Sequence, residues 1–198
     1  MKRSSLYSPH PAFAMEAAGL RLLKERTGRT LEHWVALVQK RGPRATKERV
    51  AWLKADHGIT TNYAQWIVAR AEGDGGEADY DPDALVAAMF AGKEALRPAY
   101  DRLLRLALKL GRDVKACPGK TIVPLYRTHV FAQLKPSTKT RLDLGLALGD
   151  TRAVAPLIDT GGFLKKDRIT HRIAIVAPAD LDETVVRWLR VAYDRDAP

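Results

Sequence analysis

The segment KPSTKTRLDLGLAL, residues 135–148, alternates charged and apolar side chains with the period of a β-strand. Its leucines share one side of such a strand, and the opposite side carries Lys139, Arg141 and Asp143. If the leucines pack into a core, the lysine and the arginine stand on an open sheet face. Cations in that position can contact the phosphate groups of a nucleic acid.

The strand expected just before this segment adds an aromatic ring to the same face. In HVFAQLKP, residues 129–136, alternation places Phe131 on one side together with Gln133 and Lys135. A ring on an open face can stack on a nucleic-acid base, which contributes ~1–3 kcal/mol. The contact residues predicted for this part of the chain are Lys120, Arg127, Phe131, Lys139, Arg141 and Arg172.

Two other interpretations of this face remain open. The charges can form a solvated surface on which Arg141 or Lys139 pairs with Asp143. The same face can instead form the wall of a pocket for a small anionic metabolite. That would make the protein a small-molecule-binding protein or an enzyme.

A helix, a tight turn at Gly58 and a second helix are predicted in VAWLKADHGITTNYAQWIVAR, residues 50–70. In such an arrangement the second helix can enter a DNA major groove, so Asn62 and Arg70 join the predicted contacts. Any small helical bundle also needs a glycine turn, however. Lys54 stands where a DNA-binding turn usually has alanine, which favours a plain bundle.

No arrangement of residues typical of catalysis or metal binding is found in the sequence. CPGKT, residues 117–121, matches the end of a phosphate-binding loop, but Val114 replaces the first glycine and a strand follows instead of a helix. The histidines lack the zinc-protease spacing, and DLDE, residues 180–183, fits helix capping. His171 alternates with isoleucines, which indicates a core position. We therefore predict no catalytic residue, no metal and no cofactor.

The cysteine content fits a protein of a reducing compartment. The 198-residue chain has a single cysteine, Cys117, so a disulfide within the chain is excluded, as is a cluster of zinc-binding thiolates. The first residues lack the apolar run of a secretory signal, and no later segment approaches the ~18 apolar residues of a membrane span. We expect a cytoplasmic protein without membrane contact.

Charge is distributed unevenly along the chain, which carries a net +10. Residues 1–72 contain 13 Lys and Arg against 6 Asp and Glu, and residues 84–198 contain 20 against 12. Residues 73–83 contain five acidic residues and no basic one. Two basic regions joined by an acidic segment suggest a polyanionic partner, because basic surfaces bind polyanions with release of counterions.

Apolar periodicity predicts two modules of different fold. Residues 1–72 contain four stretches of helical period, each ended by glycine or a glycine–proline pair, and predict a four-helix module. Residues 73–83 predict an acidic flexible linker. Residues 84–198 contain helical stretches, then four runs of period two, and then a closing amphipathic helix. The predicted class is therefore α+β, with an antiparallel sheet packed by helices on one face.

Two parts of the chain resemble known bacterial families. TGRTLEHWVALVQKRG followed by VAWLKADHG resembles a small helical domain of unknown function. The stretch from LRPAYDRLL through KPSTKTRLDLGL to VVRWLRVAYD resembles a second domain of unknown function, which also ends some predicted transport proteins. The second domain is similar in outline to iron-chaperone-like and YjbR-like α+β folds. The resemblance implies no activity and no site residues.

The sequence thus predicts a non-catalytic protein that binds DNA or RNA. The basic sheet face is the expected binding surface, with a helix-turn-helix-like element as a second contact. A small anionic ligand is the alternative partner. Neither the type of nucleic acid nor the oligomeric state follows from the sequence.

Overall fold

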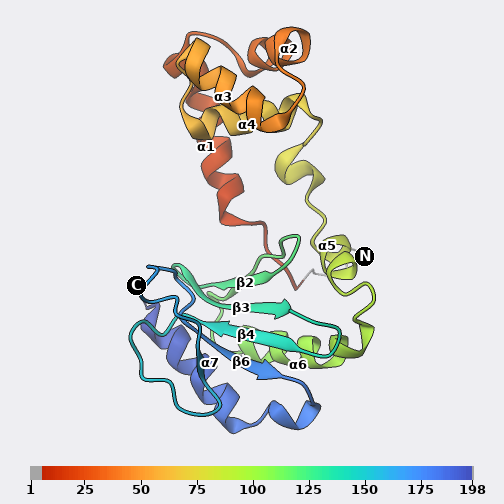
Figure 1. Cartoon of the computed structure of the whole chain (residues 1–198), viewed down its shortest axis with the longest axis vertical. Coiled ribbons are helices and arrows are strands. Elements are labelled where there is room, and N and C mark those ends of the chain that lie inside the picture. Colours follow the sequence, from red (N-terminus) through yellow and green to blue (C-terminus); the bar gives the residue numbers. More distant parts are fainter. Residues whose placement is uncertain (1–5, 198) are drawn as a thin grey trace. The chain divides into compact units, whose positions relative to one another are not determined.

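The computed structural model describes residues 6–197, which divide into two compact units (Figure 1). Residues 9–80 form the N-terminal unit, and residues 81–197 together with 6–8 form the C-terminal unit. The acidic segment 73–83 contributes a short 3-10 helix, η1 (Gly76–Asp79), to the first unit. Within the described range, no helix combines the length and the apolar character that a membrane span requires.

The N-terminal unit is built from short helices joined by tight turns. Its α-helices are α1 (Pro11–Thr27), α2 (Leu31–Arg41), α3 (Thr46–His57) and α4 (Thr61–Ala71). Gly28 and Gly58 follow α1 and α3 with φ of 72° and 66°, a left-handed conformation that glycine adopts without steric cost. The buried core of the unit consists of Leu23, Trp34, Val38, Leu53, Ile59, Ala64, Ile67 and Val68.

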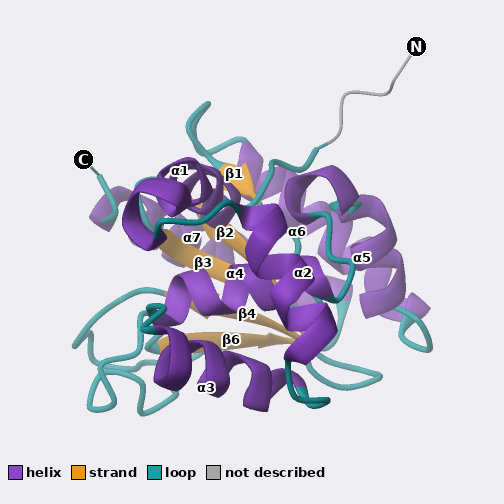
Figure 2. Ribbon diagram, turned by 90° about the horizontal axis from the view of Figure 1, so that it is seen from above, coloured by secondary structure: helices purple, strands orange, loops and turns teal. Residues whose placement is uncertain are grey.

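The C-terminal unit has an antiparallel sheet in the strand order β1-β2-β3-β4-β6-β5 (Figure 2). The strands are β1 (Lys115–Ala116), β2 (Val123–Tyr126), β3 (Val130–Pro136), β4 (Leu142–Leu146), β5 (Ile158–Asp159) and β6 (His171–Ile175). The helices are α5 (Pro82–Met89), η2 (Glu94–Leu96), α6 (Arg97–Leu108), η3 (Pro178–Asp180) and α7 (Glu183–Arg195). The predicted α+β class is confirmed. The two-residue edge strands β1 and β5 were not predicted, because two residues show no periodicity.

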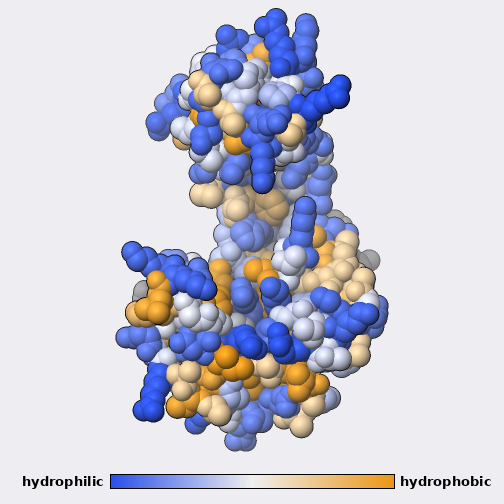
Figure 3. Space-filling model, in the orientation of Figure 1, coloured by the Kyte–Doolittle hydropathy of each residue, from blue (hydrophilic) through white to orange (hydrophobic). Residues whose placement is uncertain are grey.

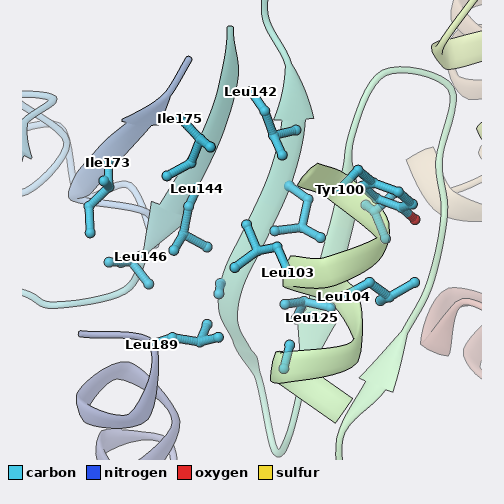
Figure 4. Packing of buried hydrophobic residues seen from close by; sticks show 14 of the residues in the cluster. Tyr100, Leu103, Leu104, Leu125, Leu142, Leu144, Leu146, Ile173, Ile175 and Leu189 are labelled. Atoms are coloured by element: carbon cyan, nitrogen blue, oxygen red, sulfur yellow. The ribbon is translucent and has the colours of Figure 1, made fainter. Parts of the chain in front are cut away.

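Helices α6 and α7 and the sheet share one hydrophobic core. Leu134, Leu144 and Ile173 form one register row across β3, β4 and β6, and all three are buried. Leu103 on α6 and Leu189 on α7 pack against the same side of the sheet (Figure 4). The leucines of β4 therefore point inward, as the alternation predicted. The opposite side, here called the outer sheet face, carries the residues between them.

Helix α7 begins with a side-chain cap that makes a testable contribution to stability. Asp182 Oδ1 accepts a hydrogen bond from Val185 N at 3.0 Å. Asp182→Ala should lower the free energy of unfolding by about 1 kcal/mol, because it leaves a backbone N–H of the first turn without its acceptor. Asp182→Asn keeps an acceptor oxygen and should retain most of that stability. Denaturant titration of the two variants checks this, and equal losses would contradict the capping role.

Candidate nucleic-acid interface

The outer sheet face brings together charged residues from three strands. Register pairs place Lys135 on β3 directly across from Asp143 on β4, and Gly145 on β4 across from Arg172 on β6. Arg141 precedes β4 by one residue and lies on the same side as Asp143 by alternation. On the side of the C-terminal unit that Figure 3 draws, hydrophilic residues lie next to hydrophobic ones.

Asp143 is the centre of a cluster of ion pairs and hydrogen bonds, here called the Asp143 cluster. Arg141 Nε lies 3.1 Å and Arg172 Nη1 3.2 Å from the same carboxylate oxygen, Oδ1. Ser137 Oγ donates to Oδ2 at 2.5 Å. The carboxylate is 13% exposed, whereas Arg141 and Arg172 are 36% and 29% exposed. The two arginine side chains are thus oriented by a largely buried anion and remain partly exposed to solvent.

The charges of the Asp143 cluster do not balance. One carboxylate faces two guanidinium groups, and Lys135, which is exposed, stands across from it on β3. The pairing of Arg141 with Asp143 that the solvated-face interpretation predicted is therefore present. A single carboxylate cannot neutralise two arginines, so an excess of positive charge remains on the face.

Lys139 and Lys120 are exposed on loops beside the sheet. Lys139 lies in the turn between β3 and β4, two residues from Arg141. Lys120 lies in the connection between β1 and β2, where Gly119 N donates to the carbonyl of Ile122. Arg141 and Arg172 thus share one carboxylate and Lys139 lies in the adjoining turn, whereas Lys120 belongs to a different loop.

Phe131 does not lie on the outer face, and the prediction of a stacking ring there is wrong. Its side chain is fully buried and packs edge-on against Tyr193 of α7, with ring centroids 5.6 Å apart. Leu125 pairs with Ala132 but the next residue, Tyr126, pairs with Val130, so Phe131 is the extra residue of a β-bulge. A bulge re-aims the side chain that it inserts, which turns Phe131 to the helix side of the sheet.

Arg127 is held against α7, away from the outer face. Its Nε donates to Asp113 Oδ2 at 2.8 Å, its Nη1 donates to the carbonyl of Tyr193, and its guanidinium lies 4.2 Å from the Tyr193 ring centroid. Hydrogen bonds from the Tyr193 hydroxyl and from Arg127 lower the pKa of Asp113. We therefore assign Arg127 to the packing of α7 and leave it out of the interface.

The two residues predicted in the N-terminal unit have different surroundings. Asn62 is exposed on the first turn of α4. Arg70 is engaged within the unit, because its Nη2 lies 2.6 Å from Glu16 Oε1 and its Nη1 donates to the carbonyl of Asp74 at 2.8 Å. Arg70 would have to break its ion pair with Glu16 to contact a phosphate. Asn62 is therefore more accessible to a nucleic acid than Arg70.

Sequence reasoning missed Lys93 and Ser137. Lys93 Nζ donates to the carbonyl of Pro136 at 2.6 Å, which places this cation beside Ser137. Lys93 comes from the connection between α5 and α6, 43 residues away, so no local pattern connects it to the sheet. Ser137 follows β3 directly, but nothing in its neighbours indicates that its hydroxyl reaches Asp143.

The remaining chemical candidates have structural roles. Cys117 is buried, and burial raises the pKa of its thiol to about 11, which opposes formation of a reactive thiolate. His171 is buried with both ring nitrogens in hydrogen bonds, to Thr170 Oγ1 and to the carbonyl of Thr151, so the predicted core position is confirmed. Within residues 6–197 no group of three or more potential metal ligands is found.

A pocket of about 670 Å³ lies beside the end of β4, in the unit where a small anionic ligand was the alternative prediction. Lys166 and Arg168 are its two cationic lining residues, and Asp167 also lines it. Arg168 is already bound, because its Nε donates to the carbonyl of Val130 and its Nη2 pairs with Asp196. The pocket thus offers an anion less free positive charge than the outer sheet face.

Comparison with known families divides the chain as the fold does. The family described as "Domain of unknown function (DUF5655)" matches residues 86–196, which span most of the C-terminal unit. The family described as "Domain of unknown function (DUF4287)" matches residues 17–73, which contain most of the four-helix unit. The predicted pair of domains of unknown function is confirmed. No curated protein and no solved structure matches the chain.

Proposed function

Because the chain belongs to the DUF5655 family, whose description states no activity, we propose its function from the outer sheet face: non-catalytic binding of single-stranded nucleic acid through phosphate contacts. The single observation that supports this proposal is the Asp143 cluster, in which two oriented guanidinium groups share one carboxylate oxygen. Arginine presents several N–H donors in a fixed fork that suits phosphate oxygens.

The arrangement favours phosphate contacts over base recognition. Arg141, Arg172 and Lys135 form the core of the proposed interface, and Lys139 extends it at the turn. Phe131 is buried and stacks no base there. Binding carried by phosphate contacts shows little sequence preference and falls steeply with salt, with a log–log slope of about 0.7 for each phosphate contacted on a single strand.

Replacing the two arginines that pair with Asp143 should weaken the binding of oligonucleotides and reduce its dependence on salt. In the full chain, Arg141→Gln and Arg172→Gln should each lower the slope of log K against log salt by about 0.7, because each removes one phosphate contact. Fluorescence anisotropy of a labelled oligothymidylate and a labelled oligouridylate of about 12 nucleotides, in about 50 to 200 mM salt, measures this.

Two further variants sharpen the test. Arg105→Gln removes an exposed arginine from α6, on the helix side of the sheet, and should leave the slope unchanged. Asp143→Asn removes the anion that competes with phosphate and should tighten binding, provided circular dichroism shows that the fold is retained. Binding that is absent, insensitive to salt, or reduced equally by Arg105→Gln would refute the proposal.

A further inference from the structure

A pocket of about 430 Å³ on the N-terminal unit is lined mainly by cationic and imidazole side chains. Arg29, His33, Lys40, Arg41 and His57 line it, and none of its eight lining residues is acidic. A groove of equal volume beside α3 and α4 of the same unit is lined by two acidic residues and one lysine. The lack of acidic groups is therefore a property of the first pocket and not of the unit as a whole.

The regular geometry of α2 creates this lining. His33, Leu37, Lys40 and Arg41 follow one another at spacings of four, three and one, which places them on one side of the helix. The N-cap Thr30 fixes the first turn, since its Oγ1 accepts from His33 N at 3.4 Å.

The two imidazole rings are held in place by their neighbours. Arg29 Nη1 lies 2.6 Å from His33 Nε2. Arginine can only donate, so His33 Nε2 is the acceptor of this hydrogen bond. The His57 ring packs edge-on against Trp34 and Trp52, with centroid distances of 5.6 and 4.6 Å. The pocket thus presents two held imidazole rings together with the side chains of Arg29, Lys40 and Arg41.

The cations of the pocket have no ion-pair partner among the residues that the structure describes. Across residues 6–197, Arg29, Lys40 and Arg41 take part in no ion pair. Arg49 and Arg70 of the same unit do pair, with Glu72 and Glu16. Three unpaired cations at one concave site repel one another, and an anion bound among them would relieve that repulsion.

We propose that this pocket binds a phosphomonoester group. A phosphomonoester carries about −1.5 to −2 charge at pH 7 and three acceptor oxygens, which matches Arg29, Lys40 and Arg41 better than a singly charged carboxylate does. The volume of about 430 Å³ lies within the range of sites for small organic ligands. Leu37 and the imidazole rings offer the organic part of the ligand an apolar and aromatic surface. Free mononucleotides and the terminal phosphate of a nucleic-acid strand share this chemistry.

Isothermal titration of the full chain with AMP, and with adenosine as the ligand without phosphate, tests the proposal. AMP should bind and adenosine should not. The double variant Lys40→Gln/Arg41→Gln should weaken AMP binding at least about tenfold, because it removes two charged hydrogen-bond donors. Lys24→Gln/Arg26→Gln removes the same residue types from the last turn of α1 and should leave AMP binding unchanged.

Oligothymidylate with and without a 5′-phosphate separates the two sources of the ligand. These titrations use the Arg141→Gln/Arg172→Gln variant of the full chain. Any binding of the strand to the outer sheet face is then weakened, so the result reports on the pocket of the N-terminal unit whether or not the proposed function is correct. Preference for the phosphorylated strand supports a strand end as the ligand, and binding of AMP alone supports a free nucleotide. Equal binding of AMP and adenosine, binding of neither AMP nor the phosphorylated strand, or an equal loss in the α1 control would overturn the proposal.

Discussion

Phe131→Ala should lower the free energy of unfolding of the C-terminal unit by about 3–5 kcal/mol. The ring is fully buried in the core between the sheet and its helices, where it contacts Tyr193 of α7. Truncation would leave a cavity at the bulge of β3, and the bulged backbone leaves neighbouring atoms little freedom to fill it. Guanidinium denaturation followed by circular dichroism measures the loss, and hydrogen exchange of β3 and β4 assigns it to this unit.

Phe163→Ala is the matched control for this prediction. Phe163 is 52% exposed, so its truncation should change stability by less than about 0.5 kcal/mol. The opposite result, in which Phe131→Ala leaves stability intact but weakens oligonucleotide binding, would show that the ring lies on the surface and stacks on bases.

Asp196→Ala should cost about 3 kcal/mol, because the buried carboxylate of Asp196 connects three segments of the C-terminal unit. Its Oδ2 accepts from the backbone N of Thr128 at 3.1 Å and of His129 at 2.7 Å, and its Oδ1 pairs with Arg168. Removing the carboxylate leaves two N–H groups of the β2–β3 turn without an acceptor and Arg168 without its anion. Denaturant titration measures the loss.

Two variants show which part of this network matters. Asp194→Ala removes an exposed carboxylate from the same end of α7 and should be nearly neutral. Arg168→Gln removes only the half-exposed partner and should cost less than Asp196→Ala, since exposed ion pairs contribute little. A loss for Asp196→Ala no larger than that for Asp194→Ala would show that the carboxylate does not hold these segments together.

The helices and the direction of the β4 leucines could be predicted because local physics determines them. Pro11 at the first turn of α1, the cap at Thr30 and the left-handed glycines at 28 and 58 act within a few residues of their own positions. The alternation in LDLGL likewise gives the strand one apolar side, and that side faces the core. For the same reason His171 could be assigned to the core.

The residues that lie on the outer sheet face could be predicted only in part. Arg172 lies on the outer sheet face as the alternation predicted, and Arg141 and Lys139 lie just before β4. Alternation assigns the correct face as long as the strands stay paired in one register. The prediction for Phe131 failed where the register breaks, since one inserted residue reverses the side of every residue before it. No residue type in HVFAQLKP signals that insertion.

By itself the sequence indicated the two modules, their helices, the antiparallel sheet and the inward leucines, because periodicity, caps and turns within short segments predict them. Only the tertiary structure decided which charged groups remain available to a partner. Arg127 donates a hydrogen bond to the carbonyl of Tyr193, 66 residues away, and Lys93 donates one to the carbonyl of Pro136, 43 residues away. Asp143 accepts a hydrogen bond from Arg172, which lies 29 residues further along the chain. Such pairings depend on how distant segments are brought together by core packing, and periodicity within one segment carries no information about them.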